Sequence, residues 1–100
     1  MPGVALHIEL KARTGQEAAV ARMVEDMRSV VALEPGNVAW LAVRTDPQTF
    51  VIVDAFQDET AREANRAGTV LQGVRDCASD RLAAPPDIRE ADVVGDWTRS

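Results

Sequence analysis

Two side chains in this sequence are candidates for moving a proton, His7 and Asp54. His7 is the only histidine of the chain, and histidine is the side chain whose ordinary pKa lies closest to neutral pH. It could take a proton from a phenolic or methylene group, or it could form a hydrogen bond at a sheet edge or subunit interface. Asp54 lies among apolar residues, where a carboxylate needs a partner or acquires a raised pKa. Arg44 is the expected partner; without such an ion pair, Asp54 is a candidate base.

A second group of residues could bind or stabilise a substrate. The amide of Asn65 can donate a hydrogen bond to an oxyanion, but it cannot act as a base at neutral pH; otherwise it is a solvated helical residue. Phe56 follows Asp54 by two residues, so in a strand the two side chains share a face. The rings of Trp40 and Phe56 can stack on a flat aromatic ligand or simply fill the core. Arg75 could pair with a phenolate or carboxylate, although most such arginines are solvated.

The single cysteine, Cys77, indicates neither a disulfide within the chain nor a Cys/His metal site, because only one histidine accompanies it. Its place on an apolar helical stripe predicts a small buried hydrophobic side chain. We therefore expect no metal and no cofactor.

Composition excludes several classes of protein. Eleven Lys and Arg against sixteen Asp and Glu give a net charge of −5, the opposite of what phosphate binding requires, so no nucleic-acid partner is expected. The longest apolar run is Val38 to Val43, far short of the ~20 residues that span a bilayer, so no membrane partner is expected either. No charged segment followed by an apolar run opens the sequence, so the expected location is a reducing cytoplasm.

The first part of the chain alternates and then changes period. Apolar residues at every second position from Val4 to Leu10 predict a strand. Thr14 and Glu17 have the spacing of a capping box, which predicts a helix start, and Pro35-Gly36 predicts its end. The helical stripe consists of Val20, Met23, Val24, Met27, Val30 and Val31.

The second part predicts two strands, further helical segments and a last strand. Residues 38–44 and 50–57 predict strands, with a turn at 45–49 between them. The first of these strands is apolar on both faces, so we expect it to be covered on both sides. Asp58 predicts a helix start and Gly68 an interruption before another helix. The stripe of that helix is Val70, Leu71, Val74, Cys77, Ala78 and Leu82, and a weaker strand is predicted over 87–97.

The order β-α-β-β-α-β predicts an α+β, ferredoxin-like domain over residues 1–100. Its four-stranded antiparallel sheet would carry helices on one face and leave the other face open. Because that open face is also apolar, we expect a homodimer packed sheet against sheet.

The stretch EPGNVAWLAVRTDPQTFVIVDAFQDETAREAN resembles the part of the chain that typifies antibiotic biosynthesis monooxygenase domains. The matching positions are Glu34-Pro35-Gly36, Trp40, Arg44, Asp46, Pro47, Asp54, Ala61 and, in the places of the family's tryptophan and histidine, Phe56 and Asn65. The resemblance implies a ferredoxin-like chain that dimerises into an α/β barrel, with a pocket in each subunit between the sheet and the helices.

The resemblance further implies a cofactor-independent monooxygenase that acts on a small aromatic substrate. On this hypothesis the deprotonated substrate itself reduces oxygen, and the protein excludes water, orients the substrate and stabilises the developing oxyanion. The expected catalytic residues are Asn65, His7 and Asp54, and the expected substrate-binding residues are Phe56, Trp40, Arg44 and Arg75. One alternative is non-oxidative binding or proton transfer in the same fold. Another is haem degradation, for which His7 is the sole possible axial ligand.

Overall fold

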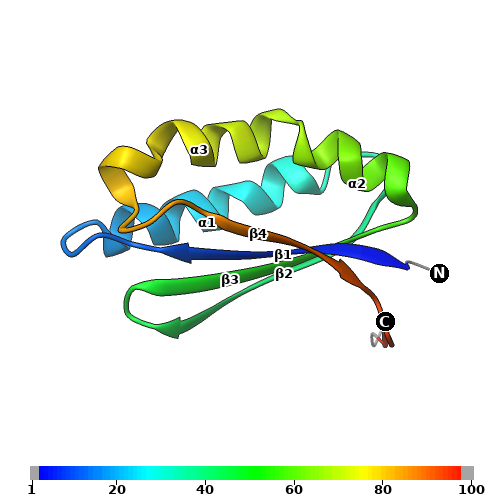
Figure 1. Ribbon diagram of the computed structural model, residues 1–100, viewed down its shortest axis with the longest axis horizontal. Helices are drawn as coiled ribbons and strands as arrows, with labels where there is room; N and C mark the ends of the chain where they lie inside the picture. The colour runs from blue at the N-terminus through cyan, green and yellow to red at the C-terminus, as the bar shows by residue number, and fades with distance from the viewer. Residues whose placement is uncertain (1–2, 98–100) are drawn as a thin grey trace.

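The computed structural model describes residues 3–97, which form one antiparallel sheet with three helices on one of its faces (Figure 1). The elements in chain order are β1 (Val4–Lys11), α1 (Glu17–Val31), β2 (Asn37–Asp46), β3 (Thr49–Phe56), α2 (Glu59–Arg66), α3 (Thr69–Arg81) and β4 (Asp87–Asp92). The strand order β2-β3-β1-β4 is that of a ferredoxin-like fold, so the predicted fold class is confirmed.

The core lies between the sheet and the helices. Alternation along β1 directs Leu6, Ile8 and Leu10 toward the helices, and all three are almost completely buried. Their partners across the sheet are Asp54, Ile52 and Phe50 of β3, so an acidic residue occupies one position of an otherwise apolar layer. The helices add to this layer the buried residues Val20, Val24, Met27, Leu71 and Val74.

Helix α1 begins without the predicted capping box. Its N-cap is Gln16, which makes no side-chain capping bond, so the assignment of Thr14 was wrong. Glu17 instead accepts a hydrogen bond from the Gly15 amide at 2.7 Å, while Thr14 accepts one from the side chain of Gln48 at 3.2 Å. The positive φ of Gly15, +91°, turns the chain between Thr14 and the helix. The predicted stripe is buried at Val20, Val24, Met27 and Val31, whereas Val30 is 45% exposed.

The loop after α1 packs tightly against α2. Gly36 has φ +85°, and its carbonyl accepts a hydrogen bond from the Gln57 amide at 2.9 Å. A Cβ atom at Gly36 would lie only 2.6 Å from the Cβ of Ala61. Only glycine fits this backbone angle and this contact, so Gly36 brings the start of β2 against α2. The helix itself ends earlier than predicted, at Val31, and not at Pro35-Gly36.

Helices α2 and α3 follow the predicted division. The carboxylate of Asp58 accepts a hydrogen bond from the Ala61 amide at 2.8 Å and caps α2, and Gly68 separates α2 from α3. Arg62 is buried and lies 3.8 Å from Glu90 on β4, and Arg66 pairs with Glu90 at 2.6 Å. These contacts hold α2 over the edge of the sheet.

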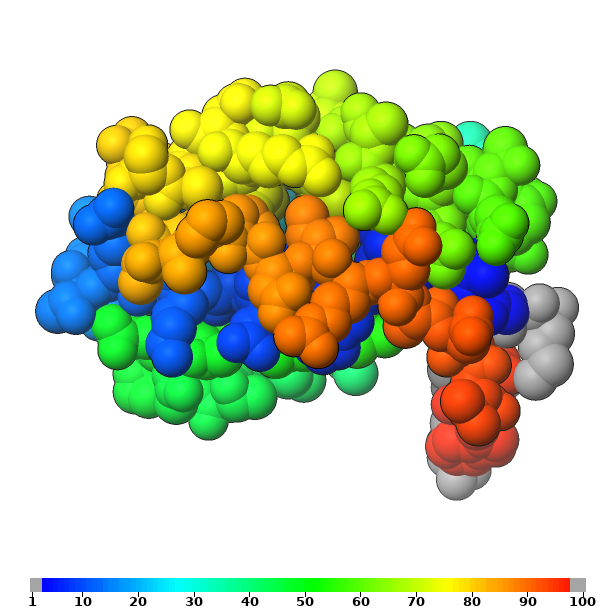
Figure 2. Space-filling model, viewed as in Figure 1, coloured from blue at the N-terminus to red at the C-terminus, as the bar shows by residue number. Residues whose placement is uncertain are grey.

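The last strand is shorter than predicted. β4 ends at Asp92, whose partner is Val4, the first residue of β1. Val93 still donates a hydrogen bond to the Gly3 carbonyl at 3.0 Å, but residues 93–97 form no strand. Val94 is fully exposed, and the segment after β4 extends away from the body of the molecule (Figure 2).

The second face of the sheet carries no helix. Leu41 is 63% exposed on this face, and Val43 and Val53 are 46% and 44% exposed. In the single chain, therefore, β2 is covered on one side only. Across residues 3–97, no helix has the length and apolar character needed to cross a membrane.

Candidate functional site

A polar cluster lies between the sheet and the helices, near the end of α1. Its centre is Asp54 on β3, which is 3% exposed and accepts a hydrogen bond from the Asn37 side chain at 3.5 Å. Asn65 on α2 is 6% exposed and donates a hydrogen bond to Glu34 at 2.7 Å. The ring of Phe56 is 1% exposed, two residues after Asp54 on the same face. The chain thus gathers two carboxyl groups and two amides at the edge of the apolar layer, with Asp54 and Asn65 buried and Glu34 and Asn37 partly exposed.

The environment of Asp54 suits it to proton transfer. Burial raises the pKa of its carboxyl group to about 7, the hydrogen bond from Asn37 opposes this rise, and the negative charge of Glu34 adds to it. Within residues 3–97, the Oδ1 atoms of both Asp54 and Asn37 are buried without a hydrogen-bond partner. At neutral pH such a carboxyl group is divided between its two protonation states, so it can both accept and return a proton.

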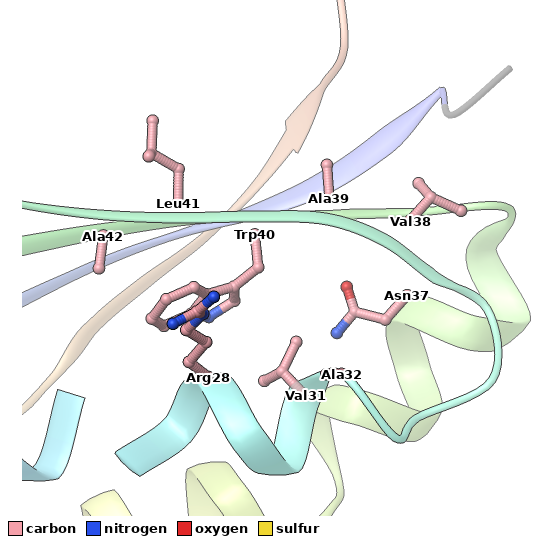
Figure 3. A pocket seen from close by; sticks show the side chains of 9 residues that line it. All are labelled: Arg28, Val31, Ala32, Asn37, Val38, Ala39, Trp40, Leu41 and Ala42. Carbon is pink, nitrogen blue, oxygen red and sulfur yellow. The ribbon is translucent and has the colours of Figure 1, made fainter. Parts of the chain in front are cut away.

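A groove runs alongside this cluster, between α1 and the edge strand β2. One part has a volume of about 410 Å³ and is lined by Arg28, Val31, Asn37 and Trp40, among others (Figure 3). A neighbouring part of about 530 Å³ shares Arg28 and Trp40 with the first. Asn37 lines the groove and also contacts Asp54, so it separates the open space from the buried carboxyl group.

The structure does not form the predicted ion pair between Arg44 and Asp54. The hairpin places Trp40 opposite Asp54 and Arg44 opposite Phe50, four residues further along β2. Arg44 instead donates a hydrogen bond to the Pro47 carbonyl at 2.6 Å, and its guanidinium carbon lies 4.9 Å from the centre of the Phe50 ring. The prediction of this pair was wrong because strand spacing alone did not give the register.

Arg75 lies apart from the polar cluster. It is exposed on α3 and donates a hydrogen bond to the Arg66 carbonyl at 3.4 Å. Cys77 is half-buried, with its sulfur 3.3 Å from the Val74 carbonyl and 3.4 Å from the Met23 sulfur. Neither residue faces the groove beside Asp54, so of the predicted residues the structure gathers Asp54, Asn65, Phe56 and Trp40.

His7 lies on the opposite face of the sheet from this cluster. Its cross-strand partners are Val53 and Arg89, and it alternates with the inward-facing residues Leu6 and Ile8. As the only histidine of the chain, it therefore offers no haem ligand to the groove. In residues 3–97, no three His, Cys, Asp or Glu side chains are grouped to hold a metal ion.

Three residues of the site escaped sequence reasoning: Glu34, Asn37 and Arg28. Glu34 and Asn37 flank Pro35-Gly36; sequence analysis interpreted Glu34-Pro35-Gly36 as a helix stop and a family match, and gave Glu34 and Asn37 no role in a site. A polar residue on each side of a Pro-Gly turn is the signal that could have found them. Arg28 is an arginine on the polar side of an amphipathic helix, which resembles any solvated arginine in sequence.

The elements described above form a ferredoxin-like chain with a buried carboxyl group near a groove between α1 and β2. The sequence matches the model of the antibiotic biosynthesis monooxygenase family over residues 3–75, and the chain belongs to that family. No curated protein matches it.

Solved structures show the same architecture along the whole chain. The NE2512 protein of unknown function from Nitrosomonas europaea is 32% identical, with a TM-score of 0.93, over 100% of this chain and 97% of that one. PA3566 from Pseudomonas aeruginosa is 15% identical, with a TM-score of 0.79, over 95% and 97% of the two chains. Rv0793 from Mycobacterium tuberculosis is 14% identical, with a TM-score of 0.82, over 96% and 99%. The last two likenesses establish the fold alone.

Proposed function

We propose that this protein is a cofactor-independent monooxygenase that acts on a small polycyclic aromatic substrate with an acidic C–H or phenolic O–H group. The observation that carries the proposal is Asp54, a buried carboxyl group with a pKa of about 7 beside a groove. Family membership supports the reaction class, and the indole of Trp40, which lines the groove, suits a flat substrate, whereas Phe56 is buried in the core.

The proposed reaction needs no external reductant. Asp54 takes the proton from a methylene group that is conjugated to a ketone through the aromatic rings, and the carbanion gives one electron to O2. The resulting radical and superoxide combine to form a C–O bond, which leaves a peroxide on that carbon. Asp54 returns its proton to this peroxide, which becomes a hydroperoxide. The Asp54 carboxylate then takes the remaining hydrogen of that carbon as a proton, the C=O bond forms and the O–O bond breaks. The departing hydroxide takes this proton back from Asp54 and leaves as water, so CH2 and O2 yield C=O and H2O.

The neighbouring residues have supporting roles in this proposal. Asn37 donates to the Asp54 carboxylate and stands between it and the groove, so a substrate that displaces Asn37 reaches the base. Asn65 holds Glu34 in place, and a second N–H of its amide remains for an oxyanion. The apolar layer around Phe56 keeps water from the carbanion.

Oxygen uptake with anthrone, a tricyclic ketone with an activated methylene, tests the proposal. We expect Asp54→Asn to lower the rate at least ~100-fold, because the amide cannot accept the proton. Asp80→Asn, a matched change at an exposed position of α3, should retain the wild-type rate. Asn65→Ala should lower the rate less than Asp54→Asn. Equal rates in wild type and Asp54→Asn would overturn the assignment of the base.

A non-oxidative proton-transfer function depends on the same carboxyl group. Under argon in D2O, either function predicts that Asp54 accelerates deuterium exchange at the anthrone methylene. Exchange that depends on Asp54, without oxygen uptake in air, would identify the non-oxidative function.

We further propose that two chains associate through the open face of the sheet. Leu41, Val43 and Val53 form an exposed apolar patch there, and burying it against a second copy removes this surface from water. The site lies on the other face, so each subunit would keep its own groove. The cytoplasmic location stays a prediction.

A further inference from the structure

One arginine beside the groove has no partner for its charge. Arg28 is exposed in the last turn of α1, and within residues 3–97 its guanidinium group forms no hydrogen bond or ion pair. By contrast, Arg62, Arg66 and Arg89 each lie within 4 Å of a carboxylate. Arg28 is thus a cation available to an incoming group.

The guanidinium group of Arg28 and the indole of Trp40 overlap in the view of Figure 3. Figure 3 shows the side chain of Arg28 rising from α1 toward the indole of Trp40, which descends from β2. Both residues line both parts of the groove, with volumes of about 410 and 530 Å³. The rest of the lining of the two parts is largely apolar and includes Val31, Ala42 and Phe50.

The charge of the groove opposes that of the whole chain. Its ionisable lining residues are Arg28, Arg44 and Glu25, which leaves one excess positive charge in a chain with a net charge of −5. Arg44 is already engaged with Pro47 and with the ring of Phe50, so Arg28 is the arginine left for a ligand. A site that combines a free guanidinium with an indole and apolar walls fits a flat aromatic anion.

We infer that the groove binds a polycyclic aromatic carboxylate, whose carboxylate pairs with Arg28 and whose rings lie along Trp40. The inference rests on the proposed function and deepens it, because it names the substrate class. A guanidinium group forms two parallel hydrogen bonds with a carboxylate, which fixes the orientation of the ring system as well as its affinity. One end of the substrate would be anchored at Arg28, and another part would reach Asn37 and Asp54.

Arg28 could also stabilise the end of α1, and this role must be separated from ligand binding. A cation in the last turn of a helix interacts favourably with the partial negative charge of the helix end. That effect stabilises the fold without any ligand, and it predicts a lower melting temperature for Arg28→Gln. It predicts no change in the affinity for an anion.

Calorimetric titration with a pair of matched probes tests the inference. The probes are anthraquinone-2-carboxylate and 2-(hydroxymethyl)anthraquinone, which share the ring system and differ in charge. We expect wild type to bind the carboxylate with at least ~10-fold higher affinity, and Arg28→Gln to lose this preference. Arg22→Gln, at an exposed position on the same helix, should retain it. Trp40→Leu should weaken both probes equally.

Each outcome decides between the possibilities. Equal affinity of wild type and Arg28→Gln for the carboxylate overturns the inference, as does a loss shared by Arg22→Gln. A lower melting temperature with unchanged affinity assigns Arg28 to the helix end alone. If the carboxylate binds through Arg28 but anthrone gives no oxygen uptake, the inference stands and the proposed function fails. If anthrone gives oxygen uptake that depends on Asp54 but the carboxylate does not bind through Arg28, only the inference is overturned.

Discussion

At the scale of single residues, Asp54 dominates the properties of this protein. Its carboxyl group occupies a position in the sheet where its neighbours on β1 are leucine and isoleucine, and only one amide donates to it. Sequence analysis found the residue from its apolar surroundings but assigned the wrong partner. The identity of that partner depends on hairpin register and on the loop after α1, and neither follows from the alternation of side chains.

The raised pKa of Asp54 predicts an unusual dependence of stability on pH. This carboxyl group has an ordinary pKa of 3.8 in the unfolded chain and about 7 in the folded one. Between these values the folded state binds more protons, so the free energy of unfolding falls as pH rises from about 4 to about 7 and is level above. A shift of this size corresponds to roughly 4 kcal/mol. Urea unfolding at pH 5 and pH 8 measures the larger part of this change, because the rest falls below pH 5.

The variant Asp54→Asn serves as the comparison for this measurement. Its amide is neutral at every pH, so the variant should be more stable than wild type at pH 8. Its free energy of unfolding should also change much less between pH 5 and pH 8 than that of wild type. Parallel pH profiles for the two proteins would show that Asp54 keeps an ordinary pKa.

At the scale of elements, hydrophobic periodicity predicted the strands and helices well. The alternation of β1, the stripe of α1 and the cap of α2 at Asp58 all occur where expected. Two predictions failed for different reasons. Thr14 does not cap α1 because Gly15 turns the chain before the helix. The last strand was predicted too long because its end depends on pairing with β1, a tertiary contact that the segment alone does not reveal.

The segment from Glu34 to Asn37 depends on Gly36, a position that no other residue fits. Gly36→Ala should destabilise the fold by ~2–3 kcal/mol for two reasons. The positive φ of this residue is unfavourable for alanine, and the new Cβ would lie 2.6 Å from the Cβ of Ala61. Thermal or urea unfolding measures the loss. The same variant should also lower anthrone oxidation, since Asn37 and Glu34 move with the loop.

Gly15→Ala is the control that separates backbone strain from steric contact. Gly15 has a similar φ of +91°, but a Cβ there would meet nothing within 4 Å. Its substitution should therefore cost only ~1 kcal/mol, the strain of the backbone angle. Equal losses at the two glycines would mean that the contact with Ala61 has no energetic effect.

At the scale of the whole molecule, one sheet separates two surfaces with different properties. The helix-covered side carries the buried carboxyl group, and the open side carries exposed valine and leucine together with His7. Sequence analysis placed His7 among the catalytic candidates because it is the only histidine. Alternation along the strand places His7 on the same face as Ala5 and Glu9. Which face of the strand the helices cover becomes clear only from the packed structure.

The open face predicts that association depends on a small number of apolar side chains. Leu41→Glu should convert a dimer into a folded monomer, because it places a charge in the middle of the patch. Light scattering after size exclusion would detect a halved mass, and far-ultraviolet circular dichroism would confirm the fold. Leu33→Glu is the matched control, since Leu33 is 85% exposed beyond the end of α1 and away from the sheet. If both variants keep the wild-type mass, association does not use this face.

The polar cluster has a further property, which follows from its position along the chain. Glu34, Asn37, Asp54 and Asn65 belong to one continuous stretch, whereas Arg28 precedes it on α1. Trp40, along which the rings of the proposed ligand lie, also belongs to this stretch, so only the charge that anchors the ligand lies outside it. A chimera that receives residues 34–65 of a relative would therefore exchange the proton chemistry and the ring platform together, while Arg28 of the host still sets the preference for an anion.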